Sequence, residues 1–418
     1  MRRILEVFLL ELRALVRTKT VATLLVAGVS WMLLIPAFLR GDGTAEGAHE
    51  LYVRFSLGGV FAFALVALLA SATGSLARER EAKRLQLTLV RPVRYCAVVL
   101  GKFAAHVVVG AAILAVAGGI LAFKTDRAEP CSHVLAPLLP SVREEAKAAY
   151  EAYMKDPRTP EAVRKAKKSA VLRLLENRAV DRYQVIPTNA VTTWRFPACP
   201  KAEVKVRMRF AAQYNLRQDV RGDLRFGGRG ASVSNITQAV LSVPLTRTEA
   251  SGAVSDELSF FNRGRNALML RPRKDVNVLV SADAFGWNLL RTLCALTAVM
   301  ALVLAFGLFL SAGLGRPVAL FVAVVTLVVG EMSPSVVDSY ADELGAGAAD
   351  RLGLVLTRVV TEVTRPFSAA APLESLAYGE CVEPDEVLRL ILTDLVVLPL
   401  LLAFLSACVL PRKQDSAT

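Results

Sequence analysis

The chain has 418 residues, of which 54% are hydrophobic and 21% charged, and its formal net charge is +13. A mean hydropathy of +0.44 is too apolar for an ordinary soluble domain and indicates a membrane protein. The many charged residues must then be segregated from apolar segments that cross the bilayer.

The N-terminal segment, residues 1–19, combines an apolar stripe with charged residues. Leu5, Phe8 and Leu12 recur at helical spacing, and arginines and glutamates occupy much of the remaining surface. This pattern predicts an amphipathic helix that lies in the membrane interface, although a charged cytoplasmic extension of the first span also accounts for it. Charged residues interrupt the apolar run, which excludes a cleavable signal peptide.

Six apolar segments follow, each near the roughly 20 residues that a helix needs to cross a bilayer, except for a short fifth segment. They are residues 21–39, 55–76, 103–123, 292–314, 317–332 and 391–410. If the N-terminus is cytoplasmic, the short inner segments hold fifteen Lys and Arg residues and the short outer ones five. We therefore expect six transmembrane helices in a bacterial inner membrane, with both termini in the cytoplasm.

Between the second and third spans lies a basic segment with an apolar side. Leu85, Leu87 and Leu89 stand among lysines and arginines, and Pro92 is expected to end a short helix. A helix at about 79–95 with an apolar side and a basic rim is suited to dock in the groove of a partner protein. Anchoring to anionic lipid would explain the same charges.

Residues 124–284 form a long insert between the third and fourth spans. They hold 28 Lys and Arg against 17 Asp and Glu and contain no apolar span. Long translocated domains are exempt from the Lys/Arg rule, so we expect an extracytoplasmic domain here. It divides an N-terminal membrane part, 1–123, from a C-terminal membrane part, 285–418.

The insert is expected to be an α+β domain, with a helical hairpin before a β-sandwich. Residues 141–155 and 161–177 read as two helices around a Pro-containing turn. The alternation in KAEVKVRMRF, residues 201–210, predicts a strand with one buried face, and further strands are expected within 240–249, 258–270 and 274–285. Its basic charge would suit an anionic partner, or only a solvated strand face, and no pattern indicates nucleic acid.

Two cysteines, Cys131 and Cys199, fall in this insert, where a disulfide between them could form. Cys381 has no evident mate, and no group of Cys and His residues has metal-ligand spacing.

Several ionisable residues lie within or near the expected spans. Arg291, Glu331 and Asp394 are at similar depth near outer ends, which suggests an outer-side polar cluster, or three groups that pair with water among the headgroups. Lys102 and His106 share one face of the third span, and Lys102 is expected to snorkel to the interface. After the fifth span, 348–365 predicts an amphipathic helix on the outer leaflet or against the outer domain.

The order of Glu79 and Glu81, a leucine-rich turn, Arg91-Pro92-Val93, and Gly101-Lys102 at the start of a span resembles the permease subunits of type-2 ABC transporters. The resemblance covers roughly 1–123 and 286–412, including the basic entry helix LELRALVRTK. Lys83-Arg84 stands where that family often has Gly-Thr. In that family the segment is the coupling helix that sits on a cytoplasmic ATPase subunit. It implies ATPase-coupling roles for Glu79, Glu81, Arg84, Leu85, Leu87, Leu89, Arg91 and Pro92.

The resemblance implies a permease, an exporter, that works as a dimer with itself or a similar permease and with two ATPase subunits. The chain has no phosphate-binding loop, because Gly101-Lys102 is followed by Phe103 and Cys96 stands where that loop needs glycine. No cofactor and no catalytic residue is therefore expected in this chain, and ATP with Mg²⁺ would bind the partner. The alternative is a receptor or assembly scaffold that binds an extracytoplasmic ligand through 124–284.

Overall fold

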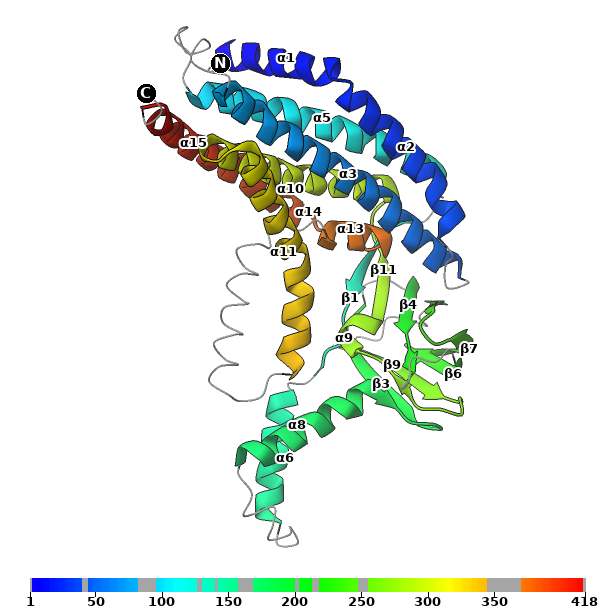
Figure 1. Cartoon of the computed structure of the whole chain (residues 1–418). Helices are drawn as coiled ribbons and strands as arrows, with labels where there is room; N and C mark the ends of the chain where they lie inside the picture. The colour runs from blue at the N-terminus through cyan, green and yellow to red at the C-terminus, as the bar shows by residue number, and fades with distance from the viewer. Residues whose placement is uncertain are drawn as a thin grey trace. The chain divides into compact units, whose positions relative to one another are not determined.

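The computed structural model describes residues 2–39, 44–81, 95–125, 130–139, 142–156, 168–199, 203–212, 218–246, 255–343 and 370–415 (Figure 1). The chain divides into two compact units. We call the first, Met1–Leu39 with His49–Glu129 and Ala284–Thr418, the helical unit. The second, Arg40–Ala48 with Pro130–Asp283, is the β unit.

The helical unit is built from long apolar helices. Its elements are α1 (Arg2–Arg17), α2 (Thr20–Phe38), α3 (Ala45–Glu81), α5 (Tyr95–Lys124), α10 (Phe285–Gly313), α11 (Arg316–Glu343), α13 (Ala370–Ala377), α14 (Pro384–Leu390), the π-helical segment η2 (Ile391–Val397) and α15 (Leu398–Asp415).

Five helices of the described residues are long and apolar enough to cross a membrane. They are Thr20–Phe38, Gly47–Glu79, Tyr95–Lys124, Phe285–Gly313 and Pro384–Val409, and each covers one of the predicted spans to within one residue. The predicted span 317–332 lies on α11, whose apolar stretch in the described part, Arg316–Gly330, is shorter than the other five. By this criterion the chain is a membrane protein, with five candidate spans among the residues that the structure describes.

Helix α10 forms the centre of the helical unit, and α5, α11 and α15 pack against it. Small residues allow close packing between α5 and α10. A Cβ atom at Gly110 would lie 2.7 Å from the Cε of Met300, and one at Gly118 would lie 2.5 Å from Cδ1 of Leu293. Packing of this kind, with small residues at the contact, is typical of helices in membranes, where shape rather than hydrophobicity drives association.

The outer faces of these helices carry large apolar side chains. Phe38, Phe123, Phe321 and Phe404 are all more than 60% exposed in the single chain. A soluble surface rarely gathers so many exposed large apolar groups, whereas hydrocarbon chains of lipid solvate them well.

Two packed helices, α6 (Val142–Lys155) and α8 (Lys168–Gln184), come after the first strand of the β unit, Ser132–Leu135. Ala146, Val171 and Leu175 form their small shared core. The predicted helix 141–155 corresponds to α6. The predicted helix over 161–177 ended too early. Helix α8 continues to Gln184, directly before the first residue of β2.

The described residues of the β unit form three antiparallel sheets. The first joins β1 (Ser132–Leu135), β11 (Val276–Ser281), β4 (Glu203–Arg209) and β8 (Val240–Thr246), and the second joins β2 (Val185–Ile186), β10 (Leu268–Met269) and β5 (Ala211–Ala212). The third joins β3 (Val191–Pro197), β9 (Ser255–Asn262), β6 (Asp219–Phe226) and β7 (Arg229–Ile236), and a short helix, α9 (Pro272–Asp275), precedes β11.

One aromatic core connects the two four-stranded sheets. Trp194, Phe196, Phe226 and Phe260 from the third sheet are almost fully buried and belong to the same cluster as Val206 of the first. The predicted alternation along β4 is present: its even-numbered residues are buried, and its lysine and arginines are half-buried. Two sheets that share one core form a sandwich-like arrangement.

Candidate functional site

The most informative polar site flanks the predicted coupling segment. Helix α3 ends at Glu81 and α5 begins at Tyr95, so both ends of that segment are defined. The side chain of Glu81 and the coupling residues Arg84, Leu85, Leu87, Leu89, Arg91 and Pro92 lie outside the described residues. Glu79, on the last turn of α3, lies inside them.

Lys102 on α5 is the centre of this site. Its Nζ atom donates hydrogen bonds to Oε2 of Glu11 at 2.7 Å and to Oε1 of Glu79 at 2.8 Å. The residue is only 2% exposed. The prediction that Lys102 snorkels to the interface was wrong, because two carboxylates compensate its charge inside the helical unit, where a lone ammonium would be costly.

The three partners come from three different helices: Glu11 from α1, Glu79 from α3 and Lys102 from α5. The Glu79 side chain is 35% exposed, whereas that of Glu11 is 12% exposed. The pair with Glu11 is therefore less screened by solvent and contributes more to holding the helices together. We call these three residues the Lys102 junction.

His106 lies one turn beyond Lys102 and extends the junction. Its ring is fully buried, with Nδ1 2.8 Å from the carbonyl oxygen of Lys102 and Nε2 3.3 Å from Oγ of Ser71 on α3. A carbonyl oxygen only accepts, so Nδ1 carries the proton, and Nε2 can accept from the Ser71 hydroxyl. A neutral ring satisfies both contacts and joins α5 to α3 a second time.

Gly101 allows α1 to come close to α5. A Cβ atom at this position would lie 2.7 Å from the Cβ of Val7 and 3.0 Å from the carbonyl oxygen of Ile4, which are distances that a side chain cannot occupy. The neighbouring residues Gly101 and Lys102 thus fix α1 in two ways, by shape and by charge.

The sequence of α1 explains why Glu11 faces the junction. Ile4, Phe8, Glu11 and Leu15 follow one another at spacings of four, three and four residues, which places them on one helix face. Leu15 is buried in the core of the helical unit, and Phe8 packs against that core. Burial of this stripe against α5 carries the Glu11 carboxylate to Lys102.

Asn288 is a further structural anchor that the sequence analysis did not identify. This fully buried residue of α10 donates from Nδ2 to the carbonyl oxygen of Glu380 at 2.7 Å and accepts from the backbone N–H of Val382 at 2.8 Å. It holds the turn between α13 and α14 against the start of α10. An asparagine beside an apolar helical run was the only available signal in the sequence.

Asp394 does not join the predicted polar cluster with Arg291 and Glu331. Asp394, 2% exposed, accepts a hydrogen bond from the Thr393 hydroxyl at 2.8 Å through Oδ1, and its buried Oδ2 has no hydrogen-bond partner. The physical reason is that Asp394 sits in the π-helical segment η2 and its side chain is turned into the unit beside Thr393. The side chain of Glu331, on α11, lies outside the described residues.

The cysteines differ from the prediction. Cys131 and Cys381 are each disulfide-bonded, whereas Cys199 keeps its thiol, so the predicted pair of Cys131 and Cys199 was wrong. Cys199 is instead buried at the edge of the β-unit core, where its backbone N–H donates to Oδ2 of Asp256 at 2.8 Å. Sequence spacing alone carried no information on which cysteines meet.

No metal-binding group of three or more His, Cys, Asp or Glu residues occurs among the residues that the structure describes. The predicted outer helix at 348–365 lies outside them. Comparisons of the chain with protein-family models, with curated proteins and with solved structures found no match. Function must therefore be inferred from the residues themselves.

Proposed function

We propose that the chain is a membrane permease, a subunit whose helices move a substrate across a membrane. More particularly, we propose the permease subunit of a type-2 ABC transporter, an exporter driven by ATP hydrolysis in a separate cytoplasmic subunit. The Lys102 junction is the observation that carries this proposal. It ties together the two helices that enter and leave the segment 82–94, and it adds α1 to them.

The junction supports a mechanical role for the segment between these helices. A force applied to 82–94 reaches the last turn of α3 and the first turns of α5. Separating these helices would leave Lys102 or a carboxylate buried without its partner, which costs several kcal/mol. The helices α1, α3 and α5 therefore respond as one body, as a coupling element that passes work from an ATPase to the spans requires.

The proposed topology has six spans, with both termini and the segment 82–94 in the cytoplasm of a bacterial inner membrane. The excess of Lys and Arg in the short loops on that side supports it. The disulfide-bonded cysteines, Cys131 and Cys381, both belong to segments that this topology places outside, where disulfides persist. The proposed assembly is a dimer of permeases, identical or similar, with two ATPase subunits.

The proposal is tested by substitutions in the segment 82–94. Leu87→Asp or Arg84→Asp should abolish co-purification of the ATPase subunit and substrate-linked ATP turnover, because each change opposes the apolar side or basic rim of the docking helix. Leu174→Asp is the matched control, since Leu174 is an exposed leucine of the β unit. If both segment variants keep their ATPase, or the unaltered protein captures none, the proposal is wrong.

A second candidate function is a receptor or assembly scaffold that binds an extracytoplasmic ligand. A cavity of about 550 Å³ in the β unit favours this candidate. The two functions differ in one cheap observation: a receptor or scaffold would be purified without any ATPase subunit and would show no ATP turnover with any added ATPase.

A further inference from the structure

Asp394 is the one charged residue in a long apolar run near the end of the helical unit. Residues 390–411 contain no other Asp, Glu, Lys or Arg, and most of them belong to the candidate span Pro384–Val409. At roughly 1.5 Å per residue, Asp394 lies about 15 Å along the helix from the start of that span. Ionisable residues so far inside a span are costly, and in membrane proteins they mark functional sites.

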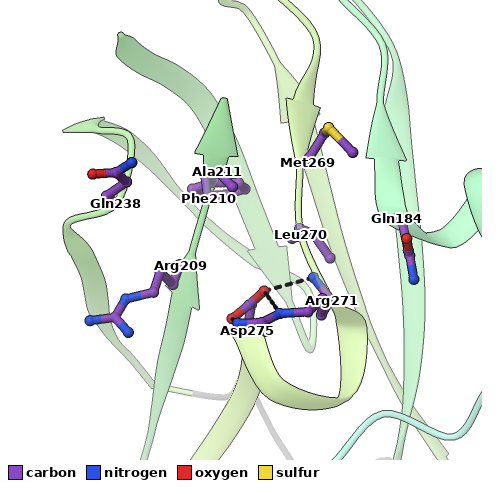
Figure 2. Close-up of a pocket in the computed structure, with 9 residues that line it drawn as sticks. All are labelled: Gln184, Arg209, Phe210, Ala211, Gln238, Met269, Leu270, Arg271 and Asp275. Atoms are coloured by element: carbon purple, nitrogen blue, oxygen red, sulfur yellow. Dashed lines mark hydrogen bonds and ion pairs between the residues drawn. The ribbon is translucent and has the colours of Figure 1, made fainter. Parts of the chain in front are cut away.

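The carboxyl group of Asp394 is enclosed but only half satisfied. The residue is 2% exposed, and its Oδ2 atom is buried without a hydrogen-bond partner in the described part of the chain. Asp275, which lines the cavity of the β unit, is also well buried, with 10% of its side chain exposed. Its Oδ2 accepts from the backbone N–H of Arg271 at 2.7 Å, and its Oδ1 accepts from Nη2 of that arginine at 3.3 Å (Figure 2). A cation thus compensates Asp275 on both oxygens, which Asp394 lacks.

The helices around η2 supply little positive charge to Asp394. The described elements that pack against η2 are α10, α14 and α15. Their charged residues are Arg291 on α10, Asp385, Glu386 and Arg389 on α14, and Arg412, Lys413 and Asp415 on α15. Among those whose side chains the structure describes, Arg389 alone acts on the Asp394 carboxyl electrostatically, and it is exposed and forms no ion pair with it. A carboxylate enclosed without a cation is strongly disfavoured, and such groups take up a proton instead.

The Thr393 hydroxyl shows how a proton is held. Its Oγ1 atom is 2.9 Å from the carbonyl oxygen of Arg389 and 2.8 Å from Oδ1 of Asp394. A hydroxyl has one proton to donate, whereas carbonyl and carboxylate oxygens only accept, so with Asp394 ionised Thr393 can bond to only one of the two. With Asp394 protonated on Oδ1, the acid donates to Thr393 and Thr393 donates to the carbonyl oxygen. Both short contacts are then hydrogen bonds.

The backbone at this pair is π-helical, which is a second and independent sign of a functional site. The N–H of Leu398 donates to the carbonyl oxygen of Thr393, five residues earlier. Pro399, the next residue, has no N–H to donate, so the regular helical ladder is interrupted here. Leu392 and Val397 on the same segment remain more than half exposed, whereas Asp394 is turned inward.

We propose that Asp394 is a proton-binding site in the membrane part of the chain. In this conformation the carboxyl carries the proton on Oδ1. When the site meets water, the proton passes to a water molecule and the Thr393 hydroxyl turns to donate to the carboxylate. A proton needs one lone pair, whereas Mg²⁺ or Ca²⁺ needs about six oxygen ligands or more, and Thr393 is the one described partner of this carboxyl. This inference does not depend on the proposed transport function.

The test uses infrared spectra of the full-length protein in detergent micelles at neutral pH. A protonated carboxyl has a C=O stretch above the amide bands in frequency, whereas a carboxylate has none there. We expect such a band in the unaltered protein, its loss in Asp394→Asn, and a downward shift in D₂O as the proton exchanges for deuterium. Asp275→Asn is the matched control, because it removes a buried carboxylate that an arginine compensates. It should leave the band unchanged.

A second measurement needs no variant and keeps the test decisive if Asp394→Asn does not fold. Dicyclohexylcarbodiimide is an apolar reagent that reacts with protonated carboxyl groups. The acid O–H adds across one C=N bond, the oxygen bonding to carbon and the proton to nitrogen, and an acyl shift to nitrogen gives a stable N-acylurea. Nothing leaves, so the peptide gains the mass of the reagent. Mass spectrometry of the unaltered protein should find this adduct on Asp394 and not on Asp275.

The proposal is overturned if the infrared band survives in Asp394→Asn, if the band does not shift in D₂O, or if the reagent modifies Asp394 no more than Asp275. Protection of Asp394 from the reagent by added Na⁺ or Mg²⁺ would identify a metal-ion site and would also overturn it. Any of these results would leave the transport proposal untouched, since none involves the segment 82–94.

Discussion

The helical unit and the β unit each contain ion pairs, and two of these pairs lie at opposite extremes of burial. In the helical unit, Lys102 is buried and neutralised by carboxylates from two other helices. In the β unit, ion pairs such as that of Arg195 with Glu257 lie on the surface, with side chains 70% and 56% exposed. The comparison teaches that an exposed pair such as Arg195 with Glu257 can be lost with little effect, whereas the buried Lys102 holds three helices together.

The largest expected effect comes from breaking the Lys102 junction. Lys102→Met leaves two carboxylates facing each other without a cation and should lower the free energy of unfolding by about 3–5 kcal/mol. Thermal unfolding of the purified protein in detergent, followed by circular dichroism, measures the loss.

The triple variant Glu11→Gln/Lys102→Met/Glu79→Gln is its control. It removes the whole set of charges and should regain most of the lost stability, because neutral groups of similar size carry no burial penalty for charge. If Lys102→Met is as stable as the unaltered protein, the ion pairs do not hold α1, α3 and α5 together.

A smaller effect is expected from disturbing the close packing of α1 against Gly101, which stands beside Lys102 in α5. Gly101→Leu places a side chain where α1 packs and should cost about 1–3 kcal/mol, through overpacking. It should also speed tryptic cleavage at Arg13 and Arg17, because α1 is pushed away from α5.

Gly119→Leu gives the matched control on the same helix, since a Cβ atom at Gly119 would meet nothing within 4 Å. Its stability and cleavage rate should equal those of the unaltered protein. Equal cleavage of both variants would show that α1 does not depend on the close approach at Gly101.

The smallest effect is expected in the β unit. Arg195→Gln removes one member of an exposed ion pair and should change the free energy of unfolding by less than about 1 kcal/mol, since solvent and salt screen such pairs. The same thermal unfolding measurement applies. If Arg195→Gln lowered the free energy of unfolding as much as Lys102→Met does, burial would not explain the difference between the two ion pairs.

Periodicity within one segment revealed much of the fold. The apolar runs located five candidate spans, and the alternation of 201–210 located β4. It did not reveal β6 and β7, although Gly227 and Gly228, both with positive φ, form the turn between them. A Gly-Gly pair between two alternating segments is a known hairpin signal and was the clue available in the sequence.

The junction, by contrast, could not be read from one segment. Lys102 is 91 residues from Glu11 and 23 from Glu79, so no local pattern connects them. A lysine near the end of an apolar run fits snorkelling equally well until the positions of α1 and α3 are known. The disulfide-bonded state of Cys131 and Cys381 was hidden for the same reason, since it depends on folding and not on spacing.

The π-helical segment η2 sets the rotational phase of the helix that follows it. Its hydrogen bonds enclose one residue more than those of an α-helix, so residues before and after it present faces that a regular helix would not align. Deleting one residue from 391–397 would turn everything downstream by about 100°. Ser406, now fully buried, would swing away from its neighbours, so the length of this short segment determines which side of α15 meets the rest of the bundle.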